Sequence, residues 1–180
     1  MKHILFINGS ASKNSSNERL IAYLISQLSS HFTCSLIDHL QQFPHFEPST
    51  LPENKPASIH YLEDQIRQAD CLFFCTPEYI FSIPSALKNL FEWLVSSDVF
   101  LQKKAALITA SAQGEKAHAE MQLILKTVMM DFPDQRSLLI QGIKGKINEQ
   151  GEITCEKTKN HVDQLITHLL SLKNASPYRI

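Results

Sequence analysis

The sequence is poor in glycine and cysteine, and its charges nearly cancel. Only five glycines and four cysteines occur among 180 residues, and 17 Lys and Arg face 18 Asp and Glu, for a formal net charge of −1. This balance gives no electrostatic attraction to nucleic acid or to an anionic membrane. No apolar run approaches the roughly 20 residues of a membrane span, and the first residues lack the apolar stretch of a signal peptide. We therefore expect a cytoplasmic protein with neither nucleic acid nor a membrane as a partner.

The cysteines and the eight histidines also lack the spacings that hold metals. There is no CxxC pair and no zinc-type spacing of cysteine with histidine. Cys71 and Cys75 lie four apart in an expected strand, where they face one side and are predicted to pack as small apolar groups. We expect neither a metal site nor a disulfide scaffold.

Short apolar runs alternate with stretches of helical periodicity, a pattern typical of βαβ units and a parallel sheet. Residues 39–57 hold four of the eight prolines and are predicted to form a surface loop. We expect one flavodoxin-like α/β domain over residues 1–180, with a doubly wound five-stranded parallel sheet in a three-layer αβα sandwich. The expected strands are 2–8, 34–38, 71–75, 104–110 and 137–141, and the expected helices are 16–30, 59–69, 84–94, 115–130 and 162–170.

A polar loop follows the first expected strand, at the edge where ligands bind in such sheets. It ends where Ser15 and Glu18 fit a capping box at a helix start. Helix amino termini attract anions, and hydroxyl and amide donors suit a phosphate monoester. The loop contains neither GxxxxGK[ST] nor GxGxxG, which disfavours a nucleotide-hydrolysing P-loop and a dinucleotide fingerprint. The alternative is that Ser15 only caps the helix and the rest is a solvated turn. The candidate anion ligands are Ser10, Ser12, Lys13, Ser15, Ser16 and Asn17.

A second loop, stiffened by Pro77 and Pro84, follows the third expected strand. Its aromatic and apolar side chains at a ligand-binding edge suit a planar ring system. The alternative is that Phe81 and Ile83 fill the core while Tyr79 covers it. The loop after the fourth strand contains Gly114 and faces the same edge.

These two loops resemble the signatures of the NAD(P)H-dependent FMN reductase family, which includes FMN, quinone, azo-dye and chromate reductases. The pattern G-S-x-R-x-x-S-x-N is matched by Gly9, Ser10, Ser15 and Asn17, with Ser12 in place of the arginine and Lys13 beside it. The pattern P-E-Y-N-x-S-x-P-x-x-L-K-N-x-x-D-W is matched by Pro77-Glu78-Tyr79, Ser82, Pro84, Leu87-Lys88-Asn89 and Trp93, with Ile80 for asparagine and Glu92 for aspartate.

The resemblance implies FMN as cofactor and NADPH or NADH as hydride donor. A small acceptor (free flavin, quinone, azo compound or metal oxyanion) would then take the electrons. No catalytic acid, base or nucleophile is required, because hydride transfer is the cofactor's chemistry. It also implies that the candidate anion ligands hold the FMN phosphate. The ring is expected beside Pro77, Glu78, Tyr79 and Ile80 on one side and Ser111, Gln113 and Gly114 on the other.

Two other classes stay open: a flavodoxin-like electron carrier, and a flavin-free binding or regulatory protein that retains the fold, which the departures at Ser12 and Ile80 favour. The helix at 84–94 bears apolar residues on more than one face, with Ala86 and Trp93 outside the main stripe. Together with the family resemblance this predicts a homodimer or homotetramer. The alternative is that Trp93 covers its own core.

Overall fold

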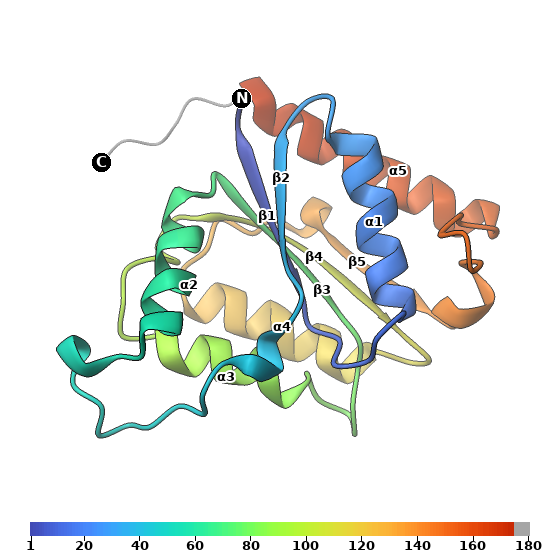
Figure 1. Ribbon diagram of the computed structural model, residues 1–180. Helices are drawn as coiled ribbons and strands as arrows, with labels where there is room; N and C mark the ends of the chain where they lie inside the picture. Colours follow the sequence, from blue (N-terminus) through green and yellow to red (C-terminus); the bar gives the residue numbers. More distant parts are fainter. Residues whose placement is uncertain (175–180) are drawn as a thin grey trace.

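The computed structural model describes residues 1–174 and contains one five-stranded parallel sheet (Figure 1). The strand order β2-β1-β3-β4-β5 places the first strand inside the sheet, which is the doubly wound, flavodoxin-like arrangement that the sequence predicted. The strands are β1 His3–Asn8, β2 Thr33–Ile37, β3 Cys71–Thr76, β4 Lys104–Ser111 and β5 Ser137–Gln141. Each lies within one or two residues of its expected position.

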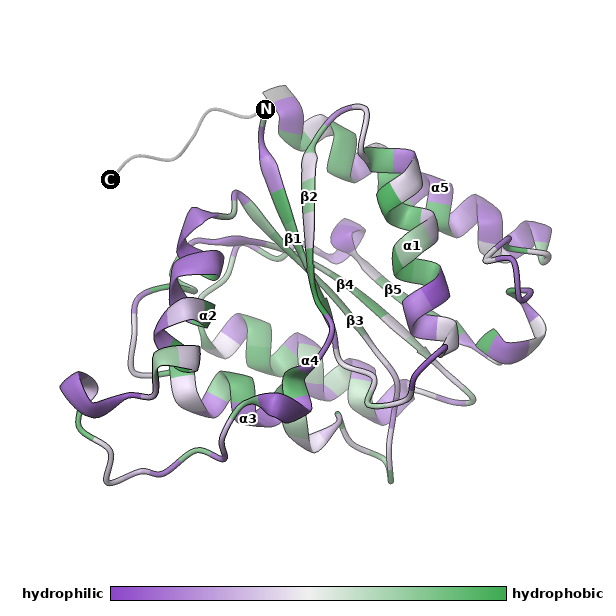
Figure 2. Cartoon of the chain, in the orientation of Figure 1, coloured by the Kyte–Doolittle hydropathy of each residue, from purple (hydrophilic) through white to green (hydrophobic). Residues whose placement is uncertain are grey.

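The helices cover both faces of the sheet (Figure 1). α1 Ser16–Leu28 and α5 Glu156–Ser171 pack on one face; α2 Ala57–Gln68, α3 Ser85–Leu94 and α4 Glu115–Thr127 pack on the other. A hydrophobic core lies on each face of the sheet, and alternate residues of β1 pack into one or the other. Phe6 faces α1 and α5, whereas Leu5 faces the other three helices. Figure 2 shows that the central strands are largely hydrophobic, whereas every helix carries hydrophilic residues as well.

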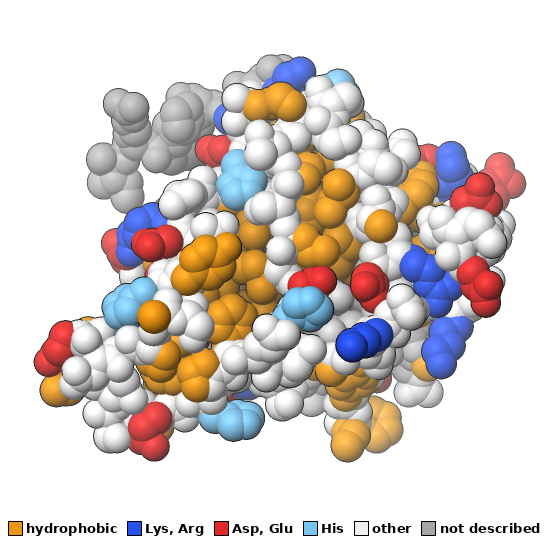
Figure 3. Space-filling view, in the orientation of Figure 1, with side chains coloured by type: hydrophobic (Ala, Val, Ile, Leu, Met, Phe, Trp, Pro, Cys, Tyr) orange, Lys and Arg blue, Asp and Glu red, His pale blue; other side chains and the backbone are white. Residues whose placement is uncertain are grey.

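Burial falls toward the edges of the sheet. Every residue of β3 is buried, as a run of apolar residues in a central parallel strand requires. The edge strand β2 has no buried residue, and Leu36 is among the exposed large hydrophobic residues. On the face shown in Figure 3, hydrophobic side chains gather between the helical layers where this edge lies, and charged side chains surround them.

The capping box predicted at the start of α1 is confirmed. The Glu18 N–H donates to the Ser15 hydroxyl over 3.1 Å, and the Ser15 N–H donates to the Glu18 carboxylate over 3.3 Å. The carboxyl ends of α1 and α4 come two and three residues earlier than the periodicity predicted. After α4 the chain turns at Met129, which has a φ of 56°. The apolar residues 128–130 therefore continue the hydrophobic pattern of α4 beyond Thr127 without continuing the helix.

The segment predicted as a loop, 39–57, is irregular up to the start of α2 at Ala57, apart from two short 3-10 turns at Leu40–Gln42 and Pro52–Asn54. It covers Trp93, whose indole N–H donates to the Pro44 carbonyl over 2.8 Å and whose ring meets Phe46 edge-on. Trp93 is only 3% exposed. The interpretation of Trp93 as part of an interface is therefore wrong, because this chain itself covers the indole.

A half-buried histidine on α4 connects two strands. His118 Nδ1 lies 2.9 Å from the Thr109 hydroxyl, and Nε2 lies 3.1 Å from the Ser137 hydroxyl. Desolvation by burial lowers the pKa of His118 below its ordinary value of 6.5. The folded state therefore favours the neutral ring. As the pH falls through the ordinary histidine pKa, the unfolded state binds more protons than the folded state does.

We expect His118 to make the protein less stable as the pH falls below about 6.5. Urea unfolding at about pH 7.5 and about pH 5.5, which bracket the ordinary histidine pKa, checks this in the wild type and in His118→Gln. The loss of unfolding free energy between the two pH values should be smaller in the variant. An equal loss in both proteins would show that His118 does not contribute.

Candidate functional site

A cavity of about 1180 Å³ lies at the carboxyl edge of the sheet, where the loops after β1, β3, β4 and β5 meet. In open α/β sheets this edge, beside the reversal of strand order, is where ligands bind. The cavity is lined by residues between Ser10 and Arg19, by Pro77–Tyr79, by Ala110–Ala112 and by residues between Gly142 and Gln150. It is large enough for a ligand of cofactor size.

The loop after β1 is held in shape by its own polar groups. The Ser10 N–H donates to the Asn8 side-chain oxygen over 3.0 Å, and the Ser12 N–H donates to the Ser10 hydroxyl over 3.3 Å. The Gly9 N–H donates to the Cys75 carbonyl over 2.8 Å, which fixes the loop against β3. The loop is therefore preorganised where it meets the cavity.

The start of α1 offers backbone donors to this cavity. The capping box uses the Glu18 N–H, but the N–H groups of Ser16 and Asn17 have no acceptor among residues 1–174. The Asn17 side chain is buried and donates to the Ala110 carbonyl over 3.0 Å. Asn17 can therefore meet an anion through its backbone, while its side chain anchors α1 to β4.

Tyr79 connects the loop after β3 to the loop after β1. Its hydroxyl lies 3.3 Å from the Ser10 hydroxyl and 3.5 Å from that of Ser12. Partial burial raises the pKa of Tyr79, but hydrogen bonding with Ser10, Ser12 and the Ala11 backbone outweighs this effect and lowers the pKa overall. Tyr79 thus brings a polar group to the expected anion site, as well as an aromatic face beside the cavity.

Two carboxylates attach the loop after β3 to α4. Glu78 accepts from the N–H groups of Gly114, Lys116 and Ala117 over 3.2, 2.9 and 3.0 Å, so it caps α4 from a distant loop. Glu120 accepts from the Ser82 hydroxyl over 2.7 Å and from the Ile83 N–H over 3.0 Å. The Glu78 side chain is thereby directed at α4 and not at a ligand.

Between these two anchors the chain forms a two-residue hairpin. Tyr79 and Ser82 exchange backbone hydrogen bonds of 2.9 and 3.1 Å, while Ile80 and Phe81 have φ values of 49° and 60°. Hairpin turns with two positive φ angles favour Asn-Gly, and a β-branched residue there is strained. Ile80 is 95% exposed and Phe81 69% exposed, so Phe81 does not fill the core, whereas Ile83 is buried.

Replacing Ile80 with asparagine should raise the free energy of unfolding by about 1 kcal/mol, because asparagine tolerates the left-handed conformation. For a chain of this size that corresponds to a rise in Tm of about 2–4 °C in a thermal melt. Leu51→Asn is the matched control, since Leu51 is 55% exposed but has a φ of −68°. A Tm that falls equally in both variants would contradict the assignment of strain.

The structure brings most of the predicted site residues together at one cavity. The following line it: Ser10, Ser12, Lys13, Ser15, Ser16, Asn17, Pro77, Glu78, Tyr79 and Ser111. Ile80, Gln113 and Gly114 lie outside its lining. Ile80 lies in the exposed turn of the hairpin, and Gly114 is the N-cap residue of α4, where its φ is 88°.

Two parts of the cavity lie outside the site that the sequence predicted: Arg19, and the segment that follows β5. Residues between Gly142 and Gln150 form a wall of the cavity, and Ile147 in this wall pairs with Ile153, just beyond it, in an isolated antiparallel bridge. Arg19 lies four residues beyond the helix cap and joins this wall to the loop after β1. The expected site stopped at Asn17 because the first signature ends there.

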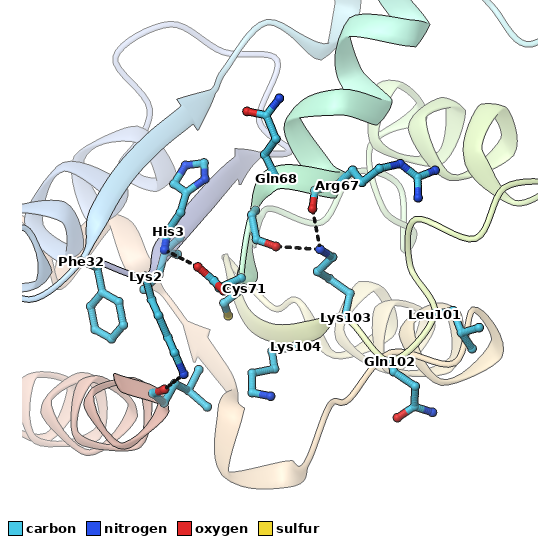
Figure 4. A pocket seen from close by; sticks show the side chains of 14 residues that line it. Lys2, His3, Phe32, Arg67, Gln68, Cys71, Leu101, Gln102, Lys103 and Lys104 are labelled. Carbon is cyan, nitrogen blue, oxygen red and sulfur yellow. Dashed lines mark hydrogen bonds between the residues drawn. The ribbon is translucent and has the colours of Figure 1, made fainter. Parts of the chain in front are cut away.

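A second cavity, of about 310 Å³, lies at the opposite edge of the sheet, and Lys2, Lys103 and Lys104 are among the residues that line it (Figure 4). The Lys103 ammonium donates to the carbonyls of Arg67 and Ala69 over 3.1 and 2.7 Å, at the carboxyl end of α2. The Lys2 ammonium donates to the Leu172 carbonyl over 2.6 Å. Two of these three lysines thus serve carbonyls at helix ends, where a positive charge is stabilising.

Neither a membrane span nor a metal cluster is found in the part of the chain that the structure describes. Within residues 1–174 no helix has the length and apolar character to cross a membrane. No three histidine, cysteine or acidic side chains of these residues are grouped to hold a metal ion. Cys71 and Cys75 are buried, and burial raises the pKa of Cys71 to about 12, so their thiols pack as small apolar groups.

Several known proteins resemble this chain in sequence. A family model described as NADPH-dependent FMN reductase matches residues 2–142. An NAD(P)H-dependent FMN reductase of Pseudomonas aeruginosa is 26% identical over 171 residues, which cover 92% of each chain. A quinone reductase of Escherichia coli K12 is 34% identical over 124 residues, and the alignment covers 64% of each chain.

Solved structures show the same fold. FerB, a flavoenzyme NAD(P)H:(acceptor) oxidoreductase from Paracoccus denitrificans, superposes with a TM-score of 0.84 at 24% identity, over 96% of this chain and 97% of that one. A flavodoxin from the domain Archaea superposes with a TM-score of 0.65 at 11% identity, over 97% of this chain and 100% of that one.

Proposed function

Because this chain belongs to the NADPH-dependent FMN reductase family, we propose that its carboxyl-edge cavity holds FMN. The observation that carries the proposal is that backbone N–H groups at the start of α1 and serine hydroxyls in the loop before it lie together at the cavity. These donors suit a terminal phosphate. The chain is an FMN-dependent NAD(P)H oxidoreductase, in keeping with the reductases that it resembles.

The residues of the chain bind and orient the cofactor. Ser10 and Ser12 would donate hydroxyl groups to the phosphate, together with the N–H groups of Ser16 and Asn17. Tyr79 would lie between phosphate and ring, since its hydroxyl already meets both serines. Pro77–Tyr79 and Ser111 would border the ring from two sides of the cavity. When bound, FMN accepts hydride from a nicotinamide and passes the electrons to an acceptor.

The acceptor would be a small molecule such as a flavin or a quinone. The reductases of Lactobacillus johnsonii and Escherichia coli that resemble this chain are named for these two substrate classes. The L. johnsonii protein, an NADH-dependent flavin reductase subunit, is 28% identical over 138 residues, covering 74% of this chain and 72% of that one. We also propose that the protein is cytoplasmic and that it forms a homodimer or homotetramer. Light scattering of the purified protein tests the oligomeric state directly.

Initial rates distinguish a reductase from an electron carrier. With NADPH or NADH and a soluble quinone varied together, a nicotinamide that leaves before the acceptor binds gives parallel lines in double-reciprocal plots. Substrates that must bind together give intersecting lines. The proposal expects rapid turnover and parallel lines. A flavin-loaded protein that does not oxidise either nicotinamide would instead indicate a carrier of the flavodoxin kind.

A further inference from the structure

Arg19 occupies a position in the cavity that the first signature does not include. It is the fourth residue of α1 and is one of the residues that line the cavity beside the loop after β1. Nη2 donates to the Asn14 carbonyl over 3.2 Å, and Nη1 donates to the Asn148 carbonyl over 3.0 Å. One side chain therefore connects two walls of the cavity, which come from segments about 130 residues apart in the sequence.

The charge of Arg19 is not neutralised by the protein. Both of its partners are uncharged carbonyls, and no carboxylate within residues 1–174 lies at ion-pair distance from it. A guanidinium has five N–H donors, of which these contacts use two. Its Nε is buried and has no acceptor among the described residues. An anion in the cavity would meet a positive charge that is fixed in place and uncompensated.

Lys13 is a weaker candidate for this task, although it stands beside the motif position that Ser12 occupies. It is exposed, so an ammonium on its flexible stem loses side-chain entropy when it binds. Arg19 is partly buried and its planar group is already held by two carbonyls. Less freedom is lost when such a preorganised guanidinium binds a phosphate.

We propose that Arg19 supplies the positive charge for the FMN phosphate in this chain, in the absence of an arginine at position 12. Its contact with Asn14, whose φ is 53°, also holds the loop in its left-handed turn. Its contact with Asn148 fixes the segment 142–150 as the far wall. This inference rests on the proposed function, because it takes FMN as the ligand.

Comparing FMN with riboflavin separates the effect of the Arg19 charge from the structural effect of its contacts with two cavity walls, because riboflavin lacks the phosphate. Protein stripped of flavin is titrated with each ligand, and quenching of flavin fluorescence gives the two dissociation constants. In Arg19→Met we expect the constant for FMN to rise about tenfold or more, which corresponds to about 1.4 kcal/mol, with a much smaller change for riboflavin. Arg19→Lys should lie between the wild type and Arg19→Met.

Three results would overturn the proposal. The first is an equal loss of affinity for FMN and riboflavin in Arg19→Met, which would show that Arg19 only holds the cavity walls together. The others are an unchanged preference for FMN in Arg19→Met and a larger phosphate-specific loss of affinity in Lys13→Met. Circular dichroism identifies a variant that fails to fold, in which case Arg19→Lys decides the question by the same ratio. Arg67→Met, at the opposite edge of the sheet, is the matched control and should bind as the wild type does. A wild-type protein that binds neither flavin would contradict the proposed function, and with it the ligand that this inference assumes.

Discussion

Replacing Gly9 with alanine is expected to destabilise the protein and to disturb the cavity together. A Cβ at Gly9 would lie 2.5 Å from the Thr76 hydroxyl oxygen, 2.8 Å from the Thr76 Cβ and 3.1 Å from Leu87 Cδ2. Thr76 is fully buried at the end of β3 and cannot move freely. The added methyl group must therefore push β1 and β3 apart at the point where both strands reach the cavity.

Overpacking of this kind costs about 1–3 kcal/mol of unfolding free energy. For a chain of this size, Tm should fall by roughly 2–4 °C for each kcal/mol. Binding of FMN should weaken as well, because Thr76 leads directly into Pro77, which lines the cavity. Gly145→Ala is the matched control for stability, since nothing lies within 4 Å of its added Cβ. A Gly9→Ala protein as stable as the control would contradict the close approach.

Removing the carboxylate of Glu78 is expected to have the second large effect. Its two oxygens satisfy three backbone N–H groups at the start of α4. Charge-assisted hydrogen bonds at a helix amino terminus are stronger than neutral ones, and loss of a helix cap costs about 0.5–2 kcal/mol. Because the same contacts join the loop after β3 to the loop after β4, Glu78→Ala should also loosen the cavity wall at Pro77–Tyr79.

We expect Glu78→Ala to lower the free energy of unfolding by about 2 kcal/mol and to raise the dissociation constant for FMN. Glu78→Gln should have a smaller effect, because its single carbonyl oxygen keeps part of the acceptor set. Urea unfolding and FMN titration measure the two effects. Glu53→Ala, on an exposed 3-10 turn, provides the control. Stability of Glu78→Ala equal to that of the control would show that the cap contributes nothing.

The sheet and its carboxyl-edge site could be predicted because their signals are local. Apolar runs of strand length marked all five strands, and the capping box at Ser15 and Glu18 marked the start of α1. The cavity followed from the rule that loops after parallel strands meet at one edge. None of these inferences required knowledge of which side chains touch.

Contacts between distant segments could not be predicted in the same way. Trp93 is covered by Pro44 and Phe46, which lie in an irregular segment without any periodic signal. Glu78 could have faced a ligand, a helix end or solvent, and only the folded chain shows that α4 takes it. Arg19 serves two carbonyls about 130 residues apart in the sequence, so no spacing in the sequence indicates its role.

The most direct test of the account is the visible spectrum of the purified protein, mixed with FMN and freed of excess by gel filtration. We expect flavin bands that stay with the protein, bleach when NADPH or NADH is added without oxygen, and return when air or a quinone is admitted. Protein that emerges without flavin would contradict it. The cavity would then hold another anionic ligand, and the chain would be a member of the family that retains the fold without its cofactor.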